Sequence, residues 1–216
     1  MKNILDIYTE YKIIPNLREH QIRVASVGKI IADSLAGDID RTGIVCALLL
    51  HDMGNILKFD FSVFPETLEP LGLAYWESVK EEYREKYGSD EHLATLLIAK
   101  ELGVAERIIS YIDSTGFTKI PYNLKEGSME EKICNYSDMR VGPFGLLSLE
   151  DRMNEGWQRY KDRKDRTLAR DEEREIIVRD AFLLEGSIFE NSTLKPEDLN
   201  DVSIESTVKD LKTWII

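Results

Sequence analysis

The stretch Ile44-Val45-Cys46-Ala47-Leu48-Leu49-Leu50-His51-Asp52-Met53-Gly54 indicates how this chain folds. Its first seven residues are apolar nearly all round a helix, which is typical of a central, buried helix. His51 follows Leu48 by three residues and Asp52 follows Leu49 in the same way, so both polar side chains continue apolar faces. We therefore expect a buried helix that ends near two polar side chains inside the fold.

Helical patterns continue on both sides of this stretch, and no segment shows the alternation of a strand. Asn16 and Glu19 have the spacing of a capping box and predict a helix that runs to Ala36. Ser128 and Glu131 repeat this spacing and predict another helix start. The other expected helices span residues 3–13, 40–51, 72–87, 90–103, 104–113, 148–161, 168–189 and 203–214, with 129–141 after Ser128 and loops at 55–71 and 114–127. We expect an all-α fold of about nine helices in a single domain, residues 1–216.

The composition agrees with a helical domain and restricts its partners. The 216 residues include only 13 Gly and 6 Pro, which favours helices, and this length suffices for one good core. The 28 basic residues against 40 acidic ones give a net charge of −12. Because a negative chain repels phosphate backbones at long range, an extended nucleic-acid partner is disfavoured. A local basic pocket for a small phosphorylated ligand is still compatible with this charge.

The expected location follows from features that the sequence lacks. Cys46 and Cys134 lie in apolar helical patterns, which favours reduced thiols over a disulfide framework. No apolar run reaches the ~18 residues of a membrane span. The first residues also lack the apolar block of a signal peptide. We therefore expect a cytoplasmic protein without a membrane partner.

Polar residues on apolar faces carry the strongest functional signal. His20 and Asp138 stand where the helical pattern calls for an aliphatic side chain, as His51 and Asp52 do. Burying an ionised Asp there costs on the order of several kcal/mol unless it is paired or bound to a metal. Singly, each residue has a plainer explanation, such as a hydrogen-bonded core histidine or an aspartate that links helices. Together, two imidazoles and two carboxylates suit one divalent cation.

Three motifs in this sequence resemble those of the HD-domain metal-dependent phosphohydrolases. They read Glu-His-Gln-Ile-Arg-Val-Ala around His20, Ala-Leu-Leu-Leu-His-Asp-Met-Gly-Asn around His51 and Asp52, and Asn-Tyr-Ser-Asp-Met-Arg-Val around Asp138. The resemblance covers about residues 16–145 and implies an HD-type helical bundle. It also implies that these four residues hold a metal and that the protein hydrolyses a phosphoester or phosphoanhydride bond.

The resemblance also bears on the number of metal ions. Family members with two metals use additional histidines, and this chain offers only His92 beyond His20 and His51. We therefore expect one divalent ion, with Mn, Co, Ni, Fe, Zn and Mg as the candidates. His92 stays open as a fifth ligand, as a catalytic or phosphate-contacting pocket residue, or as a core histidine.

A phosphate group at such a metal needs nearby cations. Arg23, Lys58 and Arg140 each lie close in the sequence to one of the implied ligands, and with His92 they are the expected substrate-binding residues. Lys119 lies in the loop before the helix that carries Asp138 and is a weaker candidate. An arginine can hold two phosphate oxygens through its planar fork. For each of these residues the plainer alternative is a surface cation or a salt bridge.

The general base is less well defined by the sequence. Some family members carry Glu or Lys three residues after the His-Asp pair, but Asn55 stands at that place here and carries no charge. The candidates in nearby segments are Asp60, Glu66 and Glu91, and a water held by a ligand carboxylate such as Asp52 is an equal alternative. We take Asp52, Asp60 and His92 as the candidate catalytic residues.

Aromatic residues near the motifs indicate a substrate class. Stacking on a nucleobase is possible for Phe59, Phe61, Phe64, Phe117 and Tyr122, with aromatic packing under a long loop as the alternative, so we expect the small phosphorylated substrate to be a nucleotide. Residues 148–216 have one charged and one apolar face. We expect them to form a C-terminal helical extension that covers the core or forms a homodimer.

Two other functions stay open from the sequence. A non-catalytic HD-like sensor or interaction module would have the same fold, although such relatives usually lose ligands and all four are present here. An HD-type oxygenase would need two irons. Metal content therefore distinguishes the three functions.

Overall fold

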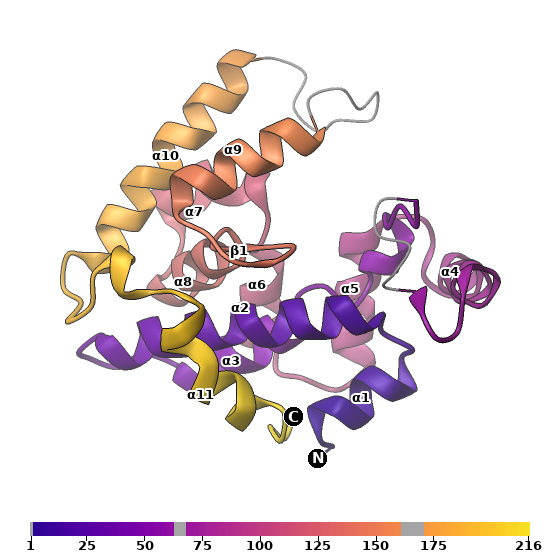
Figure 1. Ribbon diagram of the computed structural model, residues 1–216. Coiled ribbons are helices and arrows are strands. Elements are labelled where there is room, and N and C mark those ends of the chain that lie inside the picture. The colour runs from indigo at the N-terminus through magenta and orange to yellow at the C-terminus, as the bar shows by residue number, and fades with distance from the viewer. Residues whose placement is uncertain (1, 63–67, 161–170) are drawn as a thin grey trace.

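The computed structural model describes residues 2–62, 68–160 and 171–216, which are mostly helical (Figure 1). Phe64 and Glu66 lie outside these ranges, as do parts of the expected helices at 148–161 and 168–189. The α-helices are α1 (Ile4–Glu10), α2 (Pro15–Ser34), α3 (Arg41–Leu50), α4 (Leu73–Tyr87), α5 (Glu91–Glu101), α6 (Glu106–Asp113), α7 (Ile120–Glu126), α8 (Met129–Asp138), α9 (Leu149–Tyr160), α10 (Asp171–Phe189) and α11 (Asp201–Leu211). Three short 3-10 helices are η1 (Asn55–Leu57), η3 (Phe117–Lys119) and η4 (Pro196–Asp198). The all-α prediction is confirmed, and the expected number of helices was slightly too low.

The helix α7 lies in the segment expected to be a loop, so that prediction was wrong. Pro121 stands in its first turn, where the missing N–H is tolerated, and Ile120 is fully buried. α7 packs against α10, which is far away in the sequence. The pattern missed α7 because a helix of seven residues is too short to display helical periodicity, and its stability comes from that distant contact.

The helix expected at 129–141 ends earlier, at Asp138. The capping box of Ser128 and Glu131 at its start is confirmed. After α8, β1 (Val141–Gly142) pairs antiparallel with β2 (Gly145–Leu146) in a small hairpin. Asp138 is therefore the last residue of α8.

The capping box expected from Asn16 and Glu19 was wrong. α2 begins at Pro15, with Ile14 at the N-cap position and no side-chain hydrogen bond to the cap. A proline fits the first position of a helix because its fixed φ is helical and its missing N–H would have no partner there. Asn16 therefore lies inside the first turn of α2.

The centre of the fold is formed by α2, α3 and α8, which contact one another. Gly28 lies on α2 at this crossing. A Cβ at Gly28 would overlap Leu48 of α3 and lie 3.2 Å from Oγ of Ser137 on α8. A glycine therefore allows α2 to approach both of the other helices closely, which brings their polar residues together.

The C-terminal helices pack onto this core. α10 contacts α7 and α8, and α11 contacts α2. The two ends of the chain lie side by side (Figure 1), joined by hydrogen bonds in both directions between Lys2 and Ile216. None of the described helices combines the length and apolarity needed to cross a membrane.

Candidate metal centre

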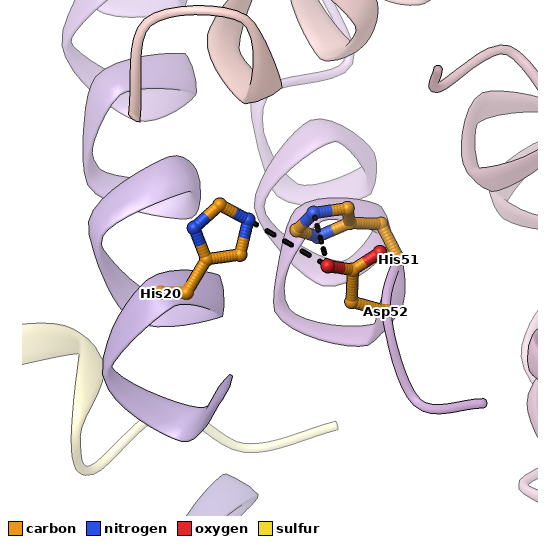
Figure 2. A group of neighbouring side chains, drawn as sticks. All are labelled: His20, His51 and Asp52. Carbon is orange, nitrogen blue, oxygen red and sulfur yellow. Dashed lines mark ion pairs between the residues drawn. The ribbon is translucent and has the colours of Figure 1, made fainter. Parts of the chain in front are cut away.

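Side chains from α2 and from the end of α3 converge at one place (Figure 2). His20 Nε2 lies 3.6 Å from Asp52 Oδ2, and His51 Nε2 lies 3.7 Å from the same oxygen. The centroids of the two imidazole rings are 5.5 Å apart. Each of the three residues offers one ligand atom, and these atoms all lie within 4.8 Å of one another.

Asp138 joins this group from the end of α8. Its Oδ1 lies 3.2 Å from His20 Nε2 and 3.4 Å from His51 Nε2. Each carboxylate therefore contacts both imidazoles, although the residues come from three helices. We call His20, His51, Asp52 and Asp138 the His-Asp cluster.

The last turn of α3 orients His51. This residue caps the helix, and its Nδ1 donates to the Leu48 carbonyl at 2.7 Å. Tyr8 of α1 donates its hydroxyl to the next carbonyl, that of Leu49, at 2.6 Å. Because a carbonyl can only accept, Nδ1 of His51 carries a proton. Nε2 is therefore the ring nitrogen that faces the carboxylates.

Asp52 lies beyond the end of α3, so its position depends on neighbouring helices. Its peptide N–H donates to Oε1 of Gln21 on α2 at 3.2 Å. The Gly54 N–H donates to Oγ1 of Thr95 on α5 at 2.9 Å. A Cβ on Gly54 would overlap the Glu91 carbonyl, so glycine allows this turn to lie against α5. The turn that carries Asp52 is therefore held between α2 and α5.

The contacts within the cluster shift the pKa values of its members. Burial opposes ionisation of Asp138, but the hydrogen bond to His20 and the charges of His20 and His51 hold its pKa well below the usual range. Burial likewise lowers the pKa of His51, but Asp52 and Asp138 outweigh it and raise that pKa to about 9. Without a metal ion, the two carboxylates therefore favour a proton on His51.

Two expected substrate-binding residues lie near the cluster in the sequence and are accessible. Arg23 is half-buried on α2, one turn after His20, and within the described ranges it forms no ion pair or hydrogen bond. Lys58 is exposed directly after η1, and its Nζ lies 3.4 Å from Glu91 Oε1. Their roles stay predictions.

Arg140 does not have the role that we expected. Its side chain is buried, and Nε donates to the Leu147 carbonyl at 2.6 Å. Its other nitrogens donate to Tyr136 Oη and to the carbonyls of Pro196 and Leu199. A phosphate cannot reach a guanidinium whose donors are used inside the protein, so this expectation was wrong. Arg140 instead joins α8 to the C-terminal helices.

His92 and Asp60 interact with residues outside the His-Asp cluster. Nε2 of His92 lies 2.7 Å from Asp113 Oδ1, which also accepts from Lys119 Nζ at 3.2 Å. These hydrogen bonds and ions hold the pKa of Asp113 below its usual range, although burial opposes this. Asp60 is exposed in the loop after η1, where Oδ1 accepts from the N–H and hydroxyl of Ser62. Catalytic roles for both stay predictions.

Sequence reasoning missed Gln21 and Thr95, which hold the turn after α3. Gln21 follows Leu17 by four residues and precedes Val24 by three, so it lies on the same apolar stripe of α2. The test that singled out His20 would have found it. Thr95 gave no comparable signal, because a threonine on an apolar face is common.

A cavity of about 910 Å³ lies beside η1. Its described lining includes Lys58, Phe59, Phe61 and Lys80 but no member of the His-Asp cluster. Lys80 donates to the Phe59 carbonyl at 2.9 Å and lies over the Phe61 ring. The cavity and the cluster therefore share no described residue.

In this all-α bundle, the imidazole of His20 lies beside the adjacent pair His51 and Asp52, a group that could hold a metal ion. Residues 17–115 match the HD domain family, a match that is consistent with the HD-domain superfamily. The fold agrees with this assignment, and HD domains are mostly metal-dependent hydrolases. The match ends before Asp138, which only the structure places in the cluster. The same comparisons found no match among curated proteins or solved structures.

Proposed function

We propose that this protein is a phosphohydrolase that binds one divalent metal ion at the His-Asp cluster and acts on a small phosphorylated substrate, a nucleotide. The observation that carries this proposal is the convergence of two imidazole nitrogens and two carboxylates, each carboxylate 3.2–3.7 Å from both nitrogens. The match of residues 17–115 to the HD domain family supports the class of reaction.

The chemistry of the cluster fits a metal ion. His51 Nε2 is buried and makes no hydrogen bond of good geometry, although both carboxylates lie at ion-pair distance. A buried nitrogen without a hydrogen bond is unfavourable in a protein interior, but such a nitrogen can bind a metal ion. Its Nδ1 bonds to a carbonyl, as is usual for metal-binding histidines. Two nitrogens and two oxygens suit Mn, Fe, Co, Ni or Zn better than Mg, which prefers oxygen.

A bound metal ion would activate a water molecule and polarise a phosphoryl oxygen. Two neutral imidazoles and two carboxylates balance a divalent charge, so a phosphate needs a further cation. Arg23 is the best candidate in the described part of the chain, because it lies one turn from His20 and is not paired there. Lys58 shares its charge with Glu91.

The nucleotide is proposed from the aromatic cavity. Phe59 and Phe61 line it, and their ring centroids lie 5.8 Å apart. The face of an aromatic ring can stack on a base. A cytoplasmic location and a homodimer formed through the C-terminal helices are further proposals.

The test is a metal titration followed by a hydrolysis screen. Metal-free protein would be loaded in turn with Mn, Co, Ni, Mg and Zn and assayed on nucleotides and generic phosphoesters. Asp52→Ala should abolish metal binding and turnover and leave the helical circular dichroism spectrum intact, because Asp52 lies outside the helices. Asp33→Ala removes an exposed aspartate on α2 and should behave like the wild type.

Three outcomes would contradict the proposal. Full turnover by Asp52→Ala would exclude the cluster as the active site. Metal binding without hydrolysis of any substrate would favour a non-catalytic HD module. Two irons per chain would favour an oxygenase.

A further inference from the structure

Gln21 is a buried polar residue beside the cluster that the proposed function does not yet use. It follows His20 on α2, and its side chain has no exposed surface. Oε1 accepts a hydrogen bond from the peptide N–H of Asp52 at 3.2 Å. Because that N–H can only donate, the amide atom facing it is the oxygen.

This hydrogen bond directly joins α2 to the turn that carries Asp52. His20 and Gln21 are neighbours on α2, whereas Asp52 lies past the end of α3. The peptide of Asp52 is therefore anchored to the same helical turn that carries His20. The bond thus sets where the Asp52 carboxylate lies relative to the His20 imidazole.

The side-chain nitrogen of Gln21 argues against a role in packing alone. Nε2 is buried and has no hydrogen-bond partner among the described residues. An unpaired amide donor in the interior opposes folding. A methionine has the same length and could fill the space without a polar atom. The feature that a glutamine adds here is its acceptor oxygen.

We infer that Gln21 is a positioning residue of the metal centre, which holds Asp52 in register with His20 through the Oε1 contact to its peptide. This inference rests on the proposed function, because it requires that Asp52 and His20 bind one ion. The substitution Gln21→Met tests it by removing the acceptor at nearly constant volume. Gln21→Glu keeps an oxygen at the same place.

The probe is Co²⁺ alone, added to metal-free protein and followed by its dissociation constant and visible absorption spectrum. Gln21→Met should bind Co²⁺ roughly 10–100-fold more weakly, the usual effect of losing a residue that orients a ligand. Its spectrum should also change, because the Asp52 carboxylate is no longer held at the ion. Gln21→Glu should retain the wild-type spectrum.

Thr95→Val is the matched control. It removes an equivalent hydrogen bond, in which a peptide N–H of the same turn donates to a side chain of another helix. This peptide is that of Gly54, which is not a proposed ligand. A purely structural role would lower thermal stability in both variants. We expect only Gln21→Met to change the spectrum.

The outcomes separate this inference from the proposed function. If wild-type protein binds no Co²⁺, both are wrong. If it binds Co²⁺ and Gln21→Met gives the same constant and spectrum, only the role of Gln21 is wrong. An equal effect of Thr95→Val, or a Gln21→Glu spectrum like that of Gln21→Met, would likewise contradict it.

Discussion

His51 shows how a single side chain is prepared to bind an ion. Its Nδ1 is engaged by the Leu48 carbonyl, so the ring cannot rotate and Nε2 faces Asp52 and Asp138. Those carboxylates also stabilise a proton on the ring, which a metal ion must displace. The same contacts therefore orient the ligand and make ion binding dependent on pH.

The stability of the metal-free protein should depend on the His51 proton. Its pKa is raised from 6.5 to about 9, so the contribution is complete below about pH 6.5 and is lost as pH rises through 9. The loss should be on the order of 3 kcal/mol. Asp138, whose pKa is lowered, contributes a loss only in acid. Chelator-treated wild type and His51→Gln should be compared by thermal unfolding between pH 6 and 10.

The wild type should lose stability more steeply than His51→Gln across this range. Saturation with Co²⁺ should remove the difference, because the bound ion replaces the proton. Parallel curves for the two metal-free proteins would contradict the raised pKa.

Arg23 should contribute to substrate binding rather than to metal binding. Loss of a charged hydrogen bond is worth about 1.5–3 kcal/mol, so Arg23→Ala should raise KM by roughly tenfold or more. The dissociation constant for the metal should stay unchanged. Lys29→Ala, which removes a cation paired with Asp33 on the same helix, is the control. An unchanged KM for every phosphorylated substrate would exclude Arg23.

At the scale of elements, α2 organises the site. It carries His20, Gln21, whose side chain accepts from the Asp52 peptide, Arg23, which has no partner among the described residues, and Gly28, which permits close packing. One helix thus fixes the relative positions of His20 as a proposed ligand, Gln21 as the residue that holds Asp52, and Arg23 as a proposed phosphate contact. Any shift of α2 away from α3 and α8 should therefore open the cluster.

Gly28→Ala tests this dependence on close packing. The new methyl group would overlap the fully buried Leu48, and overpacking costs about 1–3 kcal/mol against roughly 1 kcal/mol gained in helix propensity. We expect lower thermal stability and weaker Co²⁺ binding. Gly186→Ala, in α10, adds a methyl group that meets nothing within 4 Å and should raise stability. Changes of the same sign in both variants would contradict the packing argument.

At the scale of the whole molecule, the C-terminal helices are bound to the core through Arg140. Its guanidinium reaches the carbonyls of Leu147, Pro196 and Leu199, and Tyr136, its other partner, donates to Glu185 of α10. Because Arg140 lies two residues after Asp138, these contacts also hold the end of α8. The extension therefore supports the position of one proposed ligand.

Arg140→Met should destabilise the whole protein. It leaves several buried acceptors without donors, which costs about 3 kcal/mol or more. Thermal unfolding would measure the loss. Arg84→Met removes an exposed arginine that pairs with exposed Glu81 and should leave the melting temperature unchanged. Equal effects of the two substitutions would contradict the role of Arg140.

The sequence by itself determined the helical class, because apolar periodicity is a local property that survives in a single chain. It also determined the four members of the His-Asp cluster as polar residues on apolar faces. The short helix α7 was not predicted, because packing against α10 stabilises it rather than an apolar periodicity of its own.

Only the tertiary structure decided that Asp138 meets His20 and His51, that Arg140 is buried, and that Gln21 anchors Asp52. Each of these facts is a distance between residues far apart in the chain. Such distances are set by how closely helices pack, as at Gly28, and no spacing along the sequence contains them.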